Sequence, residues 1–121
     1  MPTEATMRAA LQAYLDHFNA GDADGLTALF ADDATVEDPV GAPPNHGKAA
    51  IHAFYVDAMK NGAKLSLSAP IRGSHSNAAA MAFEAKIGTL TVRIVDVMTF
   101  NEDGKVATMQ AYFGPEDFIQ G

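Results

Sequence analysis

The spacing of apolar residues differs on the two sides of Gly62, and that difference limits the folds the chain can adopt. Before Gly62, apolar residues recur mainly every three or four positions, which is typical of amphipathic helices, with one short alternating stretch over residues 34–40; after Gly62 they alternate with polar residues throughout, which is typical of strands. Helices followed by antiparallel strands predict an α+β domain. In such a domain helices cover one face of a sheet, and the other face is left for water or a partner subunit.

The element boundaries follow from this spacing and from turn-forming residues. Helices are predicted over residues 4–19, over a short stretch after the N-cap residue Asp22 that carries Leu26, Leu29 and Phe30, and over residues 48–60. The acidic pair Asp32-Asp33 is expected to form the turn that closes the short helix. Strands are predicted over residues 34–40, 64–72, 77–87, 89–101 and 105–113.

The length and composition predict one domain, covering residues 1–121. A chain of 121 residues with a hydrophobic fraction of 48% can fill one core but not two, and no linker, repeat or low-complexity tract divides it. No stretch approaches the roughly 20 apolar residues of a membrane span, and the first residues lack a signal-peptide pattern. We therefore expect a soluble, cytoplasmic protein.

Several kinds of chemistry are excluded or disfavoured by composition. The absence of cysteine excludes thiol nucleophiles and metal-thiolate sites, and a net charge of −7 disfavours nucleic acid as a partner. The histidines do not have the spacing of metal ligands; they are His17, His46, His52 and His75. The chain also lacks a glycine-rich phosphate loop. We expect neither a metal nor a cofactor.

Two aspartates fall in apolar phases of predicted strands. Asp96 continues an otherwise apolar row made of Leu90, Val92, Ile94, Met98 and Phe100. Asp38 shares the phase of Ala34 and Val36, whereas its neighbour Glu37 has the opposite phase and is expected to be solvated. Burial of an ionised carboxylate without partners costs several kcal/mol, so such a group is normally protonated, hydrogen-bonded or functional.

Two tyrosines show the same pattern on the predicted helices. Tyr14 and Tyr55 lie on apolar helix faces, where a buried hydroxyl needs a partner. Taken singly, an aspartate of this kind can be a strand-end or bulge residue, and a tyrosine can simply pack. Together the four side chains indicate a pocket between the helices and the sheet that suits an uncharged, apolar substrate with one polar group.

The residues carrying these features resemble the bacterial ketosteroid isomerases. The resemblance rests on Tyr14, the stretch Asn19-Ala-Gly-Asp22, the run Leu29-Phe-Ala-Asp-Asp-Ala-Thr-Val-Glu-Asp-Pro-Val-Gly41 and Asp96, and it covers almost the whole chain. It implies the family's fold, a curved antiparallel sheet wrapped around three helices into a cone, which the nuclear transport factor two superfamily shares. It also implies a homodimer formed through the sheets.

The resemblance further implies an activity and a role for each polar residue. Asp38 would be the general base that moves a proton within a 3-oxo-Δ5-steroid to give the 3-oxo-Δ4 product. Tyr14 and a protonated Asp96 would form the oxyanion hole, and Tyr55 would donate to the Tyr14 oxygen. This family is itself a standard example of a carboxylic acid kept neutral in an apolar site, so these roles come from the resemblance. The expected steroid-contacting walls are Phe54, Phe83, Met109 and Phe113.

Two other classes of function remain open at this point, because one fold hosts many activities. The first is another enzyme of the cone fold, such as a polyketide cyclase or an epoxide hydrolase. The second is a non-catalytic dimer that binds a hydrophobic ligand. Hydrolysis would place solvent oxygen in the product, isomerisation would only move protons, and a carrier would bind the steroid without turnover.

Overall fold

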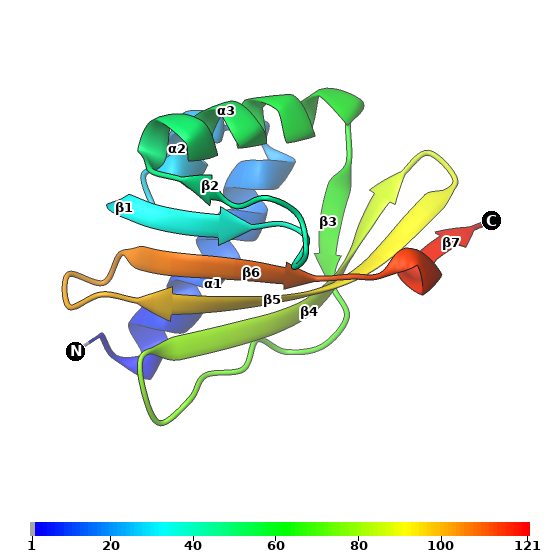
Figure 1. The fold of residues 1–121 in the computed structure, drawn as a ribbon. Coiled ribbons are helices and arrows are strands. Elements are labelled where there is room, and N and C mark those ends of the chain that lie inside the picture. Colours follow the sequence, from blue (N-terminus) through cyan, green and yellow to red (C-terminus); the bar gives the residue numbers. More distant parts are fainter. Residues whose placement is uncertain (1) are drawn as a thin grey trace.

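A computed structural model describes residues 2–121 and has the expected mixture of helices and sheet (Figure 1). The helical elements are α1 (Glu4–Asn19), α2 (Ala23–Thr27), α3 (Lys48–Ala58) and the short 3-10 helices η1 (Met59–Asn61) and η2 (Pro115–Asp117). The strands are β1 (Phe30–Glu37), β2 (Asn45–His46), β3 (Lys64–Leu67), β4 (Ala78–Ile87), β5 (Leu90–Phe100), β6 (Val106–Tyr112) and β7 (Phe118–Gln120). The α+β class is confirmed.

The strands form one curved sheet that does not close into a barrel. Its order is β2-β1-β6-β5-β4-β3, with β7 paired to β5, and α1 to α3 pack against one face, as in the cone fold (Figure 1). The expected antiparallel pairing holds for the other strand pairs, but β1 and β6 run parallel, so the sheet is mixed. After β1 the chain continues through β2, α3, β3, β4 and β5, and β6 then runs beside β1 in the same direction.

Helix α1 supplies the buried face predicted from its spacing. The Thr3 hydroxyl caps its first turn by accepting from the backbone N of Thr6 at 3.1 Å. Gly21 follows its last turn with a φ of +69°, a conformation that favours glycine. The buried side chains of α1 are Met7, Leu11, Tyr14, Leu15 and Phe18. Helix α1 therefore presents Tyr14 to the sheet.

The second helix is shorter than expected, and β1 begins earlier. Asp22 does cap α2, accepting from the backbone N of Gly25 at 2.9 Å. The helix ends at Thr27, however, and the buried Phe30 already belongs to β1, where it pairs with Val106 of β6. Asp32 and Asp33 are exposed strand residues and do not form the expected turn. Pairing with a distant strand outweighed the local turn signal in this segment.

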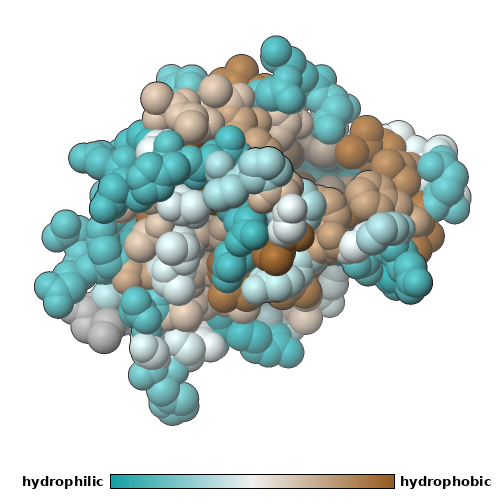
Figure 2. All heavy atoms as spheres, viewed as in Figure 1, coloured by the Kyte–Doolittle hydropathy of each residue, from teal (hydrophilic) through white to brown (hydrophobic). Residues whose placement is uncertain are grey.

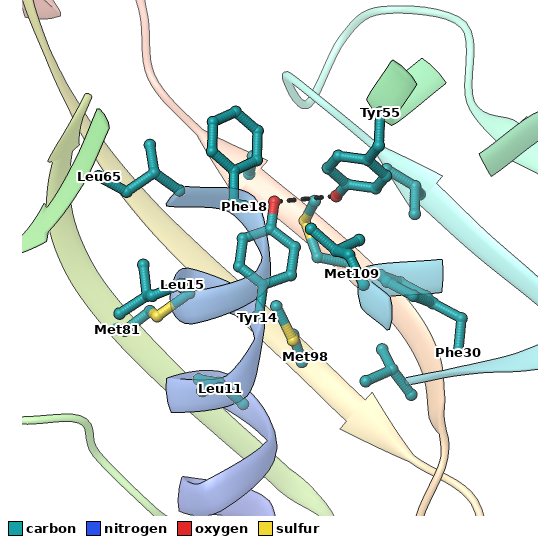
Figure 3. Packing of buried hydrophobic residues seen from close by; sticks show 14 of the residues in the cluster. Leu11, Tyr14, Leu15, Phe18, Phe30, Tyr55, Leu65, Met81, Met98 and Met109 are labelled. Carbon is teal, nitrogen blue, oxygen red and sulfur yellow. Dashed lines mark hydrogen bonds between the residues drawn. The ribbon is translucent and has the colours of Figure 1, made fainter. Parts of the chain in front are cut away.

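The hairpin of β4 and β5 fixes the register of the residues nearest the predicted site. Ile87 pairs with Leu90 across a tight turn in which Gly88 has a φ of +60°. This register pairs Met81 with Asp96. The side chains of the buried cluster then fill the space between the sheet and the helices (Figure 3).

Other strands also differ from the prediction. The strand expected over residues 64–72 ends at Leu67, and β2 and β7 were not expected. The side chain of Asn19 joins the end of α1 to β3, donating to the carbonyl oxygen of Leu65 at 2.8 Å and accepting from its backbone N at 2.7 Å. None of the helices within residues 2–121 is both long and apolar enough to cross a membrane.

Candidate active site

A cavity of about 300 Å³ lies between the sheet, α1 and α3. Its wall is mainly apolar, and the four polar residues singled out in the sequence all line it: Tyr14, Asp38, Tyr55 and Asp96. They come from α1, the end of β1, α3 and β5, so elements far apart in the chain bring them together. An apolar cavity with a few converging polar groups is the usual form of a small-molecule site.

Asp96 is the most unusual of these residues. Its side chain comes from the middle of β5, is 1% exposed, and neither carboxyl oxygen has a hydrogen-bond partner within residues 2–121. Burial raises the pKa of the Asp96 carboxyl well above its ordinary value, and the charge of Asp38 raises it further. The protonated form is therefore favoured, and its O–H is available to donate to a ligand in the cavity.

Tyr14 and Tyr55 form a hydrogen-bonded pair. Their hydroxyl oxygens are 2.9 Å apart (Figure 3), and the rings meet edge to face with centroids 5.7 Å apart. Burial raises the pKa of both hydroxyls well above its ordinary value, and nearby Asp96 and Asp38 contribute in the same direction. Both tyrosines are thus kept protonated. If Tyr55 donates within the pair, the proton of Tyr14 is free to point into the cavity.

Asp38 is in a wetter environment than Asp96. It follows the last residue of β1, precedes Pro39 across a cis peptide bond, and is half-buried. Burial raises the pKa of its carboxyl to about 6, so this group is mostly ionised at neutral pH. The cavity therefore holds one carboxylate that can accept a proton and one carboxylic acid that can donate a hydrogen bond.

Three of the four predicted wall residues line the cavity. These are Phe54, Phe83 and Phe113, and the ring of Phe54 packs edge-on against Tyr55 with centroids 5.1 Å apart. Met109 does not line the cavity. It pairs with Met98 of β5, is 1% exposed and lies within the buried cluster (Figure 3).

Other lining residues were not singled out in the sequence. Val92 and Ile94 lie on the same face of β5 as Asp96, so the alternating row already contained the signal for them. Phe118 and Asn61 also line the cavity. Phe118 could not be found in the same way, because β7 has no recognisable strand pattern.

Glu37, expected to be solvated, is half-buried and accepts from the side-chain amide of Gln110 at 3.3 Å.

The histidines lie away from the cavity. His17 contacts Asp22 at 3.2 Å and His52 contacts Asp24 at 2.8 Å. No histidine is among the residues that line the cavity. Within residues 2–121, no group of three or more histidine, cysteine or acidic side chains could hold a metal ion.

The fold and the cavity define a cone-shaped α+β protein with a mainly apolar site between the helices and the sheet, and comparison with known proteins identifies its family. The model of the SnoaL-like domain matches residues 11–109, so the chain belongs to the SnoaL-like family of the nuclear transport factor two superfamily. The steroid Δ-isomerase of Nocardioides simplex is 38% identical over 95% of each chain, which confirms the resemblance seen in the sequence.

Relatives with other activities also match. The epoxide hydrolase LasB of Streptomyces lasalocidi is 26% identical over 97% of this chain and 44% of that protein. The structure of SalBIII, an epoxide hydrolase/cyclase-like enzyme with a role in pyran ring formation in the polyether salinomycin, superposes over the full length of both chains with a TM-score of 0.91. At 24% identity, the SalBIII match shows the fold alone.

The buried state of Asp96 predicts a specific pH dependence of stability. Because the pKa of Asp96 is raised in the folded protein, the native state keeps a proton that the unfolded chain loses above about pH 3.9. The contribution of this group to the free energy of unfolding therefore falls by about 1.4 kcal/mol per pH unit from there up to the folded pKa. We expect the free energy of unfolding of Asp96→Asn to increase relative to that of wild type as pH rises from acid to neutral. Urea unfolding of both proteins at each pH measures this difference.

If the difference in free energy of unfolding between wild type and Asp96→Asn stays constant with pH, or if wild type gains stability relative to the variant as pH rises, Asp96 is not a buried neutral acid. Asp33→Asn makes the same change at an exposed position of β1 and serves as the matched control. Asp96→Leu, which also removes the unpartnered polar atoms, should be more stable than wild type at neutral pH.

Proposed function

We propose that this protein is a steroid Δ-isomerase that converts 3-oxo-Δ5-steroids into 3-oxo-Δ4-steroids by proton transfer through a dienolate. The observation that carries this proposal is that one cavity is lined by three polar groups: a buried Asp96 carboxyl group without a hydrogen-bond partner, the Tyr14 hydroxyl and the ionisable Asp38. Similarity to the steroid Δ-isomerase of Nocardioides simplex supports it. In a carrier Asp96 and Tyr14 would only orient a ligand, whereas an isomerase also uses the ionisable Asp38 as a base.

The reaction requires a base and two donors. Asp38 takes a proton from the carbon between the carbonyl group and the double bond, and the electron pair moves onto the carbonyl oxygen. The hydroxyl of Tyr14 and the protonated carboxyl of Asp96 donate to that oxygen while it carries the negative charge. Asp38 then returns the same proton to the far carbon of the former double bond. Atoms and charge balance without water or a cofactor.

The different surroundings of the two carboxyl groups suit this division of roles. A general base works best when its pKa lies near the working pH, and the pKa of Asp38 is about 6. A carboxylic acid can donate at neutral pH only if burial keeps it protonated, as it does for Asp96. Donors fixed in a mainly apolar cavity need less reorganisation than water when the oxyanion forms, so they stabilise the dienolate more than water does.

A second function in the same family is epoxide opening. The match to LasB favours it, and the same pair could act with Asp96 as the acid on the epoxide oxygen and Asp38 as the base on the attacking group. Incubation in water enriched in heavy oxygen separates the two chemistries. Hydrolysis of an epoxide incorporates the label into the product, whereas the proposed isomerisation yields an unlabelled conjugated enone.

Asp38→Asn tests the assignment of the base. Loss of a positioned base typically lowers turnover by about 10²–10⁴-fold, and binding of the 3-oxo-Δ4 product should change little because the side chain keeps its shape. Formation of the conjugated enone can be followed by its absorbance. For wild type, kcat/KM should rise with pH through about 6 and level off above it, because only the ionised carboxylate accepts a proton.

Glu37→Gln, next to Asp38 but outside the cavity lining, is the matched control. Equal losses in product binding and in turnover for Asp38→Asn would remove Asp38 from the role of base.

We also propose that the protein forms a homodimer through the outer face of the sheet. Val95 is 42% exposed there and Tyr112 is 46% exposed, and apolar exposure of this kind is typical of interfaces. Sedimentation at micromolar concentration should give the dimer mass, and Val95→Lys should shift it toward the monomer. Val56→Lys, at a 39% exposed position of α3, is the control; a monomeric wild type would refute the proposal.

A further inference from the structure

Asn61 is a polar residue of the cavity wall that has no part in the proposed reaction. It ends η1, its side chain is exposed, and it lines the cavity together with Ala58, Ala63 and Leu65 of the same segment. This segment joins α3 to β3 (Figure 1). Figure 2 shows polar side chains over the turn, whereas apolar side chains cover the tip of the β4–β5 hairpin. A new charge at Asn61 would therefore act on an apolar ligand in the cavity.

Asn61 also differs from the other asparagines of the chain. Within residues 2–121 it is the only asparagine that precedes glycine and the only one that is exposed. The others are Asn19, Asn45, Asn77 and Asn101. The side chain of Asn101, for example, accepts from two backbone N–H groups at 3.0 Å. Because asparagine is a thermally labile residue, the least protected one is where the chain is most open to chemical change.

The backbone that follows Asn61 leaves its amide group open to attack. Gly62 has a φ of +75°, and because it has no Cβ, the approach to its nitrogen is unhindered. The Gly62 N–H makes one long hydrogen bond, to the carbonyl oxygen of Met59 at 3.3 Å. The Asn61 Oδ1 accepts from the backbone N of Ala63 at 3.0 Å. This bond turns the amide group toward the following backbone and polarises its carbonyl.

We propose that Asn61 is a site of spontaneous deamidation, and that its conversion to an acidic residue weakens the binding of apolar ligands in the cavity. The modification itself does not depend on the proposed function. Only the use of a steroid to measure its effect on binding does.

The reaction needs only water as a co-reactant. The backbone nitrogen of Gly62 attacks Cγ of Asn61 and closes a succinimide ring. The bond from Cγ to the side-chain nitrogen breaks, and ammonia leaves with the proton of the Gly62 nitrogen. Water then opens the ring at either carbonyl group and gives aspartate or isoaspartate. Because the attacking nitrogen must lose its proton, the rate should rise with pH.

Both products place a carboxylate on the cavity wall. An apolar ligand takes water away from that group, and the lost hydration of a charged group opposes binding. Isoaspartate also adds one carbon to the main chain just before Ala63 and Leu65, which line the cavity. Deamidation therefore changes both the charge and the shape of this wall.

The first measurement follows the modification itself. Purified wild type is incubated at neutral and at alkaline pH, and peptide mapping by mass spectrometry follows the amide of each asparagine over time. Asn61 should lose its amide faster than the other asparagines do, and faster at alkaline pH. Asn61→Ser is the matched control, because its hydroxyl can accept from the backbone N of Ala63 but it has no amide to lose.

The second measurement follows binding of a 3-oxo-Δ4-steroid to the same samples by calorimetry. Wild type should lose affinity in step with the loss of the Asn61 amide. Asn61→Asp, which reproduces one product, should bind about tenfold more weakly than fresh wild type, because a charged group loses part of its hydration. Asn61→Ser should keep its own starting affinity throughout the incubation.

Three results would overturn this inference. They are an Asn61 amide that survives as long as those of Asn77 and Asn101, an Asn61→Asp variant that binds as tightly as fresh wild type, and an equally fast loss of affinity in Asn61→Ser. The proposed reaction is judged separately. A wild type that loses the Asn61 amide first but neither binds nor converts steroids would refute the isomerase proposal and leave Asn61 as a modification site.

Discussion

Burial of the Asp96 carboxyl group in an apolar cavity is the constraint on which the proposed chemistry depends. Neither oxygen has a protein partner within residues 2–121, so ionisation would leave a bare charge in a dry environment. Keeping the proton avoids that cost and leaves an O–H group directed at a ligand. Tyr14, kept protonated by the same burial and hydrogen-bonded to Tyr55, provides a second donor beside it. The fold thus places two protonated polar groups in one cavity, as the proposed stabilisation of a dienolate requires.

Strand pairing and helix packing maintain this arrangement. The β4–β5 pairing sets the face on which Asp96 lies, and α1 and α3 bring the two tyrosines over that face. Asp38 follows the strand that runs parallel to β6, where partial contact with water permits ionisation. The two carboxyl groups differ in environment because one lies mid-strand under the helices and the other lies at a strand end.

Much of this arrangement could be predicted from the sequence, because it depends on periodicity. The phase of β5 predicted that Asp96 is buried, and the spacing of α1 and of the helix after Gly47 predicted that Tyr14 and Tyr55 are buried; all three are. The parallel pairing of β1 with β6 and the early start of β1 at Phe30 could not be predicted, because both depend on contacts with a strand more than seventy residues away. Met109 is buried but is not among the residues that line the cavity, a distinction that alternation alone cannot make because it gives only the face of the sheet on which a side chain lies.

The most direct test of the account is the protonation state of Asp96 at neutral pH in the folded wild-type protein. Infrared difference spectra, or carbon NMR of labelled aspartate, distinguish a neutral carboxylic acid from a carboxylate. A buried, protonated Asp96 gives a neutral-acid signal that disappears in Asp96→Asn and persists in Asp38→Asn. An Asp96 signal that is already that of a carboxylate at neutral pH would contradict the oxyanion-hole assignment.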